Sequence, residues 1–233
     1  MWRSADDARS RPLKKIAQAA NPVSLAKIYE ILDQYFGDLR WWPGDSPFEV
    51  IVGAILTQNT AWKNVEAAIG RLKAEDLLHP EKMRQLADQR LADLIRPAGY
   101  YRIKTKRLKA FLDFLNEACR DDLKALFAQD LRGLRQRLLA VHGIGEETAD
   151  SILLYAGGKP VFVVDAYTRR IMQRHRIIDG NAGYAEIQAL FMNGLPRRAP
   201  LFNQYHALLV NTGKHFCSKQ RPGCECCPLQ PFL

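Results

Sequence analysis

The first twenty residues lack the long apolar run that a signal peptide or a membrane-spanning helix requires. Acidic and basic side chains alternate there with short apolar stretches, whereas a spanning helix needs about 20 consecutive apolar residues. We therefore expect a soluble, intracellular protein with no membrane partner.

Acidic residues are outnumbered by basic ones. The chain carries 25 Asp and Glu against 34 Lys and Arg, which gives a formal net charge of +9. The basic residues are spread along the whole length, so we expect a broad positive field that attracts polyanions, with nucleic acid as the first partner to consider. The alternative is that the charge serves solubility alone.

Cysteine is scarce and unevenly placed. Four of the five cysteines lie between Cys217 and Cys227. This crowding does not suit disulfides spread through a secreted fold, and it favours a metal or cluster site. Cys119 stands alone on an apolar helix face, where we expect it to belong to the core.

Strand signals and long linkers are also lacking, and helical periodicity dominates. Leu108, Phe111, Leu112 and Leu115 are spaced as one stripe of an amphipathic helix, and the uniformly apolar run Val50–Leu56 favours a buried helix. Short breaks rich in Gly and Pro separate the helices, as in a compact all-α protein. We expect two lobes that share the chain discontinuously. One lobe comprises residues 46–159, the other comprises 20–45 with 160–233, and residues 1–19 form a basic N-terminal extension.

The segment "VHGIGEETAD" predicts a tight turn between two helices. Gly143, Ile144 and Gly145 are expected to present free backbone N–H groups at a helix start. Such groups bind a phosphate without reading a base. The alternative is an ordinary helix-helix turn that needs glycine.

Asp165 is an isolated carboxylate between the apolar run "VFVV" and the basic segment "AYTRRIM". Its position suits a helix N-cap, in which the carboxylate accepts backbone hydrogen bonds. It also suits a functional anion. Composition and spacing alone leave both interpretations open.

The region from Leu138 to Ile171 resembles the helix-hairpin-helix, glycine/proline-rich loop and aspartate signature of the endonuclease III superfamily of DNA glycosylases. Gly157, Gly158 and Pro160 correspond to the loop. The resemblance implies an all-α fold of two helical lobes with a C-terminal cysteine loop.

In that family Asp165 matches the catalytic aspartate, and bifunctional members carry a Schiff-base lysine at the position of Glu147. A carboxylate cannot form an imine. The resemblance therefore implies a monofunctional glycosylase, in which the aspartate stabilises a cationic sugar and orients or activates water.

Two further segments, "LRWWPGDSPFEVIVGAILTQNTAWKNV" and "IRPAGYYRIKTKRLKAF", are similar to the 3-methyladenine DNA glycosylase III branch, and the similarity spans about residues 26–214. It implies a base pocket formed by Trp41, Trp42, Pro43, Trp62 and Lys214. N-alkylated purines carry positive charge, and indole faces stack on such bases. The alternatives are a packing role for the tryptophan pair and a phosphate contact for the lysine.

Gln58 and Asn59 match the element whose amide side chain fills the gap left by a flipped nucleotide. Asn replaces the family's second Gln, which shortens that side chain. Tyr101, with its neighbour Tyr100, is expected either to approach the opposite DNA strand or to anchor its helix.

Cys217, Cys224 and Cys227 match the first three ligands of the superfamily's C-x6-C-x2-C-x5-C iron-sulfur loop, and the fourth position falls on Leu233. Four thiolates are the usual requirement of a [4Fe-4S] cluster. The alternatives are a labile three-cysteine cluster, a zinc site, or a loop without a cofactor. Cys226 could replace the fourth ligand only with a changed loop path.

Taken together, these motifs imply a monofunctional DNA glycosylase that removes alkylated purines from duplex DNA by base flipping, in base excision repair. We expect a monomer that is cytoplasmic and associated with the nucleoid. Two alternatives remain: an endonuclease III-like glycosylase and lyase acting on oxidised pyrimidines, and a non-catalytic protein that binds DNA structures.

Overall fold

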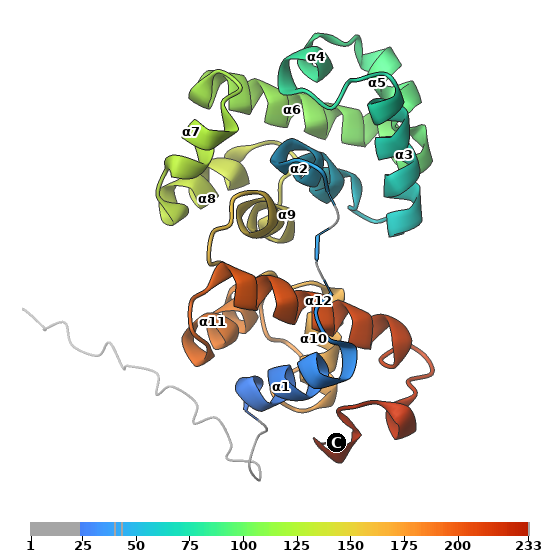
Figure 1. Ribbon diagram of the computed structural model, residues 1–233, viewed down its shortest axis with the longest axis vertical. Helices are drawn as coiled ribbons and strands as arrows, with labels where there is room; N and C mark the ends of the chain where they lie inside the picture. The colour runs from blue at the N-terminus through green and yellow to red at the C-terminus, as the bar shows by residue number, and fades with distance from the viewer. Residues whose placement is uncertain (1–23, 40, 43, 233) are drawn as a thin grey trace, which may run out of the picture.

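The computed structural model describes residues 24–39, 41–42 and 44–232, and this part of the chain is helical without a strand. The helices form two groups, one above the other in Figure 1. The predicted all-α, two-lobed fold is confirmed. The expected N-terminal extension, residues 1–19, lies outside the described residues. Within them, no helix combines the length and the apolar character needed to cross a bilayer.

The upper group in Figure 1 holds the helices from the middle of the chain: α2 (Pro47–Leu56), α3 (Trp62–Ala74), α4 (Pro80–Gln85), α5 (Asp88–Leu94), α6 (Tyr101–Cys119), α7 (Leu123–Ala128), α8 (Leu131–Ala140) and α9 (Glu146–Ser151). A 3-10 turn, Arg96–Ala98, precedes α6, and a π-helical segment η2, Ile152–Ala156, continues α9. The lower group holds α1 (Leu25–Phe36), α10 (Ala166–Arg174), α11 (Tyr184–Gly194) and α12 (Ala199–His215), followed by short turns at Cys224–Cys226 and Gln230–Phe232.

Helix α2 forms the centre of the upper lobe. It begins at Ser46, whose hydroxyl accepts the N–H of Glu49 at 3.2 Å, and every residue from Phe48 to Leu56 is buried. A helix that is apolar all round is stable only when protein surrounds it. The predicted buried helix is therefore confirmed.

Helix α6 packs its apolar stripe on the same core. Leu108, Phe111, Leu112 and Leu115 are each at most 1% exposed, as their spacing predicts. Cys119, at the end of this helix, is half-buried against the core and its thiol donates to the carbonyl of Leu115 at 3.3 Å.

The helix that follows the hairpin departs from regular spacing. Ala149, Ile152 and Leu153 are fully buried, but regular α-helix ends at Ser151 and a π-helical segment runs on to Ala156. The wider π turn adds a residue per turn. A periodicity of 3.6 residues does not reveal it.

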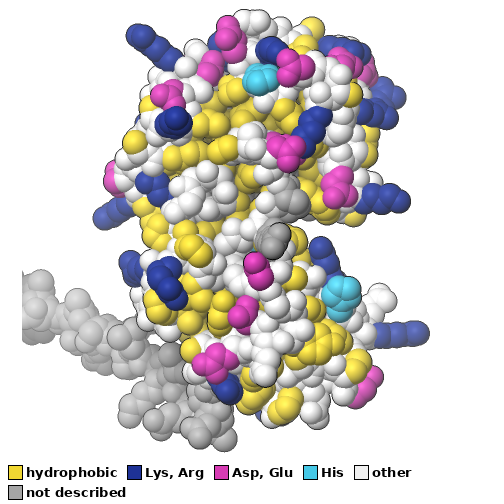
Figure 2. Space-filling model, viewed as in Figure 1, with side chains coloured by type: hydrophobic (Ala, Val, Ile, Leu, Met, Phe, Trp, Pro, Cys, Tyr) yellow, Lys and Arg dark blue, Asp and Glu magenta, His cyan; other side chains and the backbone are white. Residues whose placement is uncertain are grey.

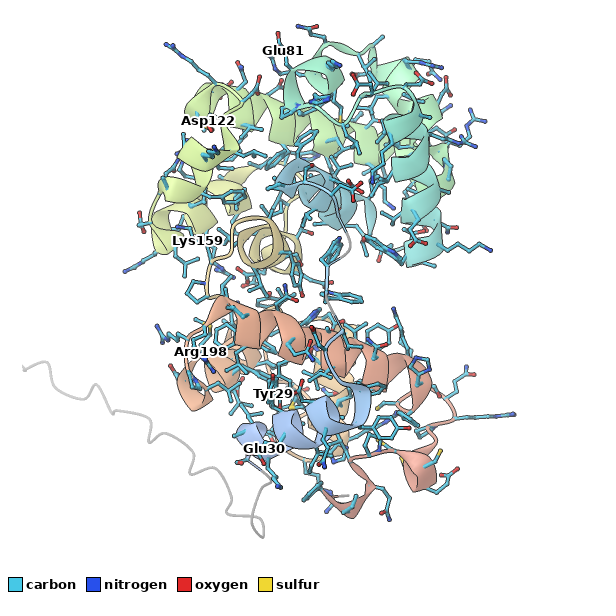
Figure 3. All side chains as sticks on the ribbon, viewed as in Figure 1. Tyr29, Glu30, Glu81, Asp122, Lys159 and Arg198 are labelled. Atoms are coloured by element: carbon cyan, nitrogen blue, oxygen red, sulfur yellow. The ribbon has the colours of Figure 1, made fainter. Side chains whose placement is uncertain are left out.

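The two ends of the described chain pack together in the lower lobe. The Tyr205 hydroxyl donates to the carbonyl of Leu25 at 2.8 Å, and Gln204 donates to the Asp33 carboxylate at 2.8 Å. Tyr29, labelled in Figure 3, meets Tyr205 edge to face with ring centroids 5.3 Å apart. Helices α1 and α12 thus share one core, while the lobe boundaries at residues 46 and 159 stay predictions. Figure 2 shows Lys and Arg side chains projecting from both lobes.

Candidate active site

A cavity of about 570 Å³ is lined by residues of both lobes. Helices α2, α3, α6 and α9 contribute from the upper lobe, and α10 and α12 from the lower lobe. The lining side chains that are aromatic, polar or charged enough to bind a base or take part in a reaction include Trp41, Trp42, Gln58, Asn59, Trp62, Arg107, Glu147, Asp165, His206 and Lys214.

Asp165 caps the first turn of α10 and also faces this cavity. Its Oδ1 accepts the N–H of Thr168 at 2.7 Å, and its Oδ2 lies 3.7 Å from Nε2 of His206. The side chain is 12% exposed. The two interpretations of this carboxylate are therefore compatible, because one oxygen serves as the cap while the other remains available in the cavity.

A buried carboxylate, Asp150, holds in place the segment that leads into α10. Asp150 is fully buried and accepts Nε of Arg135 at 2.7 Å, the hydroxyl of Tyr184 at 2.8 Å and the amide of Gln188 at 2.7 Å. The same Tyr184 hydroxyl accepts the N–H of Val164 at 3.4 Å. Because Arg135 and Asp150 belong to α8 and α9 whereas the other two belong to α11, this network joins the two lobes beside the cavity.

Glu147 brings a second carboxylate to the cavity wall. Burial raises its pKa to about 7, and the charge of Asp165 adds to the effect. Protein atoms of the cavity wall surround this residue, but its side chain remains exposed to solvent in the open cavity. Near neutral pH this carboxyl is therefore divided between its two protonation states.

Three indoles line the cavity, and Trp42 packs edge to face against each of the other two. The rings of Trp42 and Trp62 lie 5.1 Å apart at 89°, and those of Trp41 and Trp42 lie 5.9 Å apart at 73°. Nζ of Lys214 stands 5.5 Å from the Trp41 ring. Pro43, the remaining predicted pocket residue, lies outside the described residues.

Gln58 and Asn59 line the cavity in different ways. The amide nitrogen of Gln58 donates to the carbonyl of Gly143 at 3.0 Å and to the hydroxyl of Thr148 at 2.9 Å, and its oxygen accepts a short hydrogen bond from Arg107. Asn59 is exposed, with φ of +54°. Gln58 therefore ties the end of α2 to the hairpin. The side chain of Asn59 is exposed and can extend toward a bound ligand.

The hairpin corrects one detail of the sequence interpretation. The N–H of Ile144 donates to the carbonyl of Val141 at 3.1 Å, so it is not a free donor. Gly143 has φ of +83° and a Cβ there would overlap Arg107, while Gly145 precedes the first residue of α9. Two of the three expected amides, those of the glycines, remain candidates for a phosphate contact.

Tyr101 does not line the cavity. It begins α6, half-buried, with the guanidinium groups of Arg96 and Arg102 at 5.2 and 5.9 Å from its ring. Its neighbour Tyr100 is 68% exposed. The structure therefore favours anchoring for Tyr101 and leaves Tyr100 facing solvent.

His206 and Arg107 are cavity residues that the sequence interpretation missed. A signal existed for the histidine, because His206, Val210 and Lys214 are spaced by four residues on one helix and all three line the cavity. Arg107 carried no such signal, since the first half of α6 also carries Arg102, Lys104, Lys106 and Lys109.

The three cysteines of the predicted cluster loop share a second, small cavity on α10 and α12. Arg174 donates to Sγ of Cys217 at 3.1 Å, and burial raises the pKa of Cys227. Thiols are soft donors, and three of them lining one cavity suit an iron-sulfur cluster in their chemistry. They supply three of the four usual ligands. The fourth position, Leu233, lies outside the described residues. Within residues 24–39, 41–42 and 44–232, no three His, Cys, Asp or Glu side chains are arranged to hold a single metal ion.

Comparison with known proteins settles the family. The family model of the HhH-GPD superfamily of base excision DNA repair proteins matches residues 52–197. The chain belongs to this superfamily. A protein of Methanocaldococcus jannaschii, provisionally named a DNA repair glycosylase, is 47% identical over 207 residues, which cover 88% of this chain and 94% of that one.

Other similar proteins include both kinds of enzyme that the motifs suggested. Endonuclease III of Sulfolobus acidocaldarius is 27% identical over 79% of this chain and 80% of its own. The crystal structure of H. pylori 3-methyladenine DNA glycosylase bound to 1,N6-ethenoadenine superimposes with a TM-score of 0.70 at 28% identity, over 81% of this chain and 94% of that one. A non-covalent endonuclease III–DNA complex superimposes with a TM-score of 0.77 at 21% identity, over 89% and 92%, and shows the shared fold.

Proposed function

We propose that this HhH-GPD protein is a monofunctional DNA glycosylase that removes alkylated purines, of the 3-methyladenine type, from duplex DNA by base flipping. It acts as a monomer on nucleoid DNA in the cytoplasm. The observation that carries the proposal is that Glu147, which cannot form an imine, faces the cavity shared with Asp165.

The chemistry follows from the charges in the cavity. As the bond between C1′ and the base nitrogen breaks, positive charge develops on the sugar, and the carboxylate of Asp165 stabilises it. A cationic N-alkylated purine leaves as a neutral base, so the site needs no strong acid. Water then adds to C1′ and yields an abasic site.

Recognition of the base falls to the indoles. Trp42 and Trp62 present perpendicular faces to the cavity, and an electron-rich face stacks on a cationic purine. Asn59, exposed beside the cavity, fills the gap in the duplex, whereas Gln58 braces the loop behind it. The amides of Gly143 and Gly145 contact the phosphate backbone.

The experiment that tests the assigned role compares Asp165→Asn with Asp122→Asn. Asp122 is also an N-cap, accepting two backbone N–H groups of α7 in the upper lobe, away from the cavity (Figure 3). Asparagine is a good cap, so both variants keep their helices. We expect Asp165→Asn to bind lesion DNA as tightly as the wild type or more tightly, with base release reduced at least about 100-fold. Asp122→Asn should release base normally, and unchanged turnover in Asp165→Asn would contradict the assignment.

A second candidate activity is an endonuclease III-like glycosylase and lyase. Lys214 supports it, because an amine that lines the cavity with Asp165 could form an imine with C1′ in place of the family's hairpin lysine. Borohydride treatment would then trap a covalent protein–DNA adduct that Lys214→Gln abolishes. The proposed monofunctional enzyme gives no adduct.

The proposal includes a [4Fe-4S] cluster held by Cys217, Cys224 and Cys227. Such a cluster would tie the C-terminal loop to α10 and α12. Iron and sulfide analysis of protein purified without oxygen should give about four of each per chain, and Cys224→Ser should lose both. Zinc at one per chain, or no metal, would contradict this part of the proposal.

A further inference from the structure

Three side chains from three elements form a line that ends at Asp165. The Tyr155 hydroxyl, on η2, lies 2.5 Å from Nδ1 of His206, on α12. Nε2 of the same imidazole lies 3.7 Å from Oδ2 of Asp165. His206 is 5% exposed and lines the cavity.

Electrostatics selects one tautomer of His206. Burial raises the pKa of Tyr155 well above its ordinary value, so the hydroxyl keeps its proton. If that proton is donated to Nδ1, Nε2 carries the ring hydrogen and directs it at the carboxylate of Asp165. In the opposite tautomer a lone pair on Nε2 would face the anion, which is unfavourable in a buried site.

The spacing between Nε2 of His206 and Oδ2 of Asp165 allows one small molecule to contact both atoms. A separation of 3.7 Å is too long for a direct hydrogen bond. Among the described residues, Nε2 of His206 has no hydrogen-bond partner although it is buried. One water molecule can contact two polar atoms at this spacing, with about 2.8 Å to each.

We propose that Tyr155 and His206 form a positioning pair, in which Tyr155 fixes His206 as the Nε2–H tautomer and His206, with Asp165, holds the water that attacks the sugar. This role rests on the proposed glycosylase function. Oδ2 of Asp165 accepts one water hydrogen, Nε2–H of His206 donates to the water oxygen, and a lone pair on that oxygen is thereby directed toward C1′.

The step balances without any further reactant. The bond between C1′ and the base nitrogen breaks, and its electron pair leaves with the purine. The water oxygen forms the new C1′–O bond, and its proton passes to Oδ2 of Asp165. His206 neither gains nor loses a proton, so it is a positioning residue for the attacking water.

The charged neighbours of the pair define its pH response. Besides Asp165, the titratable or charged side chains around the cavity are Glu147 from α9, Arg107 from α6, Tyr167 from α10 and Lys214 from α12. Burial lowers the pKa of His206, and the charge of Asp165 offsets only part of that shift. Loss of the Tyr155 hydroxyl frees Nδ1 to bind a proton, and the resulting imidazolium would neutralise Asp165.

The test compares His206→Leu, His206→Gln and Tyr155→Phe in single-turnover base release and in lesion-DNA binding. We expect the rate of His206→Leu to fall by about 100-fold, with the dissociation constant within about 3-fold of the wild type. His206→Gln should recover most of the rate because its amide N–H replaces Nε2–H. Tyr155→Phe should lose roughly 10-fold and shift the acid limb of its pH profile to higher pH. Two controls remote from the cavity, His79→Gln and Tyr35→Phe, should match the wild type.

Equal losses in His206→Leu and His206→Gln, or an unchanged rate in both, would overturn the positioning role. A readout independent of catalysis is the imidazole ¹⁵N spectrum of the whole protein, with the His206 signals assigned by their loss in His206→Gln. The wild type should show the Nε2–H tautomer, and Tyr155→Phe should lose it. If the wild type releases no base, the proposed function fails while the ¹⁵N spectrum still decides the pair, and an Nδ1–H tautomer in the wild type would overturn it.

Discussion

Replacement of Asp150 by Asn tests how the cavity is held together. Asp150 is fully buried, and its two oxygens accept four donors: two N–H groups of Arg135, the hydroxyl of Tyr184 and the amide of Gln188. An Asn side chain removes the charge and places an NH₂ group against at least one of these donors. The variant therefore loses the ion pair with Arg135, and its new NH₂ group opposes a hydrogen-bond donor of a neighbouring side chain.

The expected loss of unfolding free energy is about 3 kcal/mol. Removal of one partner of a buried ion pair costs about 3–5 kcal/mol. The Arg135 side chain is 25% exposed, so water can solvate part of its unpaired charge, which places the value at the lower end. Urea unfolding followed by circular dichroism measures the difference.

The matched control is Glu30→Gln, which removes an exposed ion pair with Lys27. The side chain of Lys27 is 57% exposed and that of Glu30 is 63% exposed. Glu30 is labelled in Figure 3 on α1. Exposed pairs of this kind contribute less than about 0.5 kcal/mol. If Asp150→Asn lost no more than Glu30→Gln, Asp150 would not be the link that joins the lobes. If Asp150→Asn kept its stability and base release, its role in placing the segment before α10 would also be refuted.

Three further predictions concern the cavity and its frame. Since desolvation in the cavity wall raises the pKa of Glu147 from 4.5 to about 7, wild-type stability falls as pH rises through this range. Because the side chain is exposed, solvent screens part of this effect, and Glu147→Gln should gain about 1 kcal/mol on the wild type between pH 5 and 8.5. Glu146→Gln, at the adjacent position, should not. Burial lowers the pKa of Lys104 to about 8, so stability should rise by roughly 2 kcal/mol from pH 8 to pH 10 in the wild type, and urea unfolding of Lys104→Met should show no such rise. Trp62→Ala should slow base release at least about 10-fold more than it weakens binding to undamaged DNA, and equal losses would mean a structural role.

The sequence predicted those parts of the fold in which the apolar pattern of a single helix is enough to show which of its residues are buried. The stripe Leu108 to Leu115 and the apolar run Val50–Leu56 are buried as their patterns indicate, because amphipathic and fully apolar helices have few alternatives in water. The position of Asp165 was predicted for the same reason, since an N-cap is a local feature.

Features made by contacts between distant segments were not predictable in this way. Gln58 donates to Gly143, 85 positions away, and so became a brace instead of a free side chain. His206 reaches Tyr155 across 51 positions and across the lobe interface, and it approaches Asp165 within the lower lobe. Neither pairing leaves a periodic trace in the sequence, because the first depends on how the lobes pack and the second on how α10 packs against α12.

The most direct test of the central claim is base release from duplex oligonucleotides that carry 3-methyladenine, 7-methylguanine or thymine glycol, measured with and without subsequent alkali. We predict release of a methylated purine, with strand breakage only after alkali. Strand breakage at thymine glycol without alkali would contradict the account, because it would show that an amine of this protein forms the imine that Glu147 cannot form.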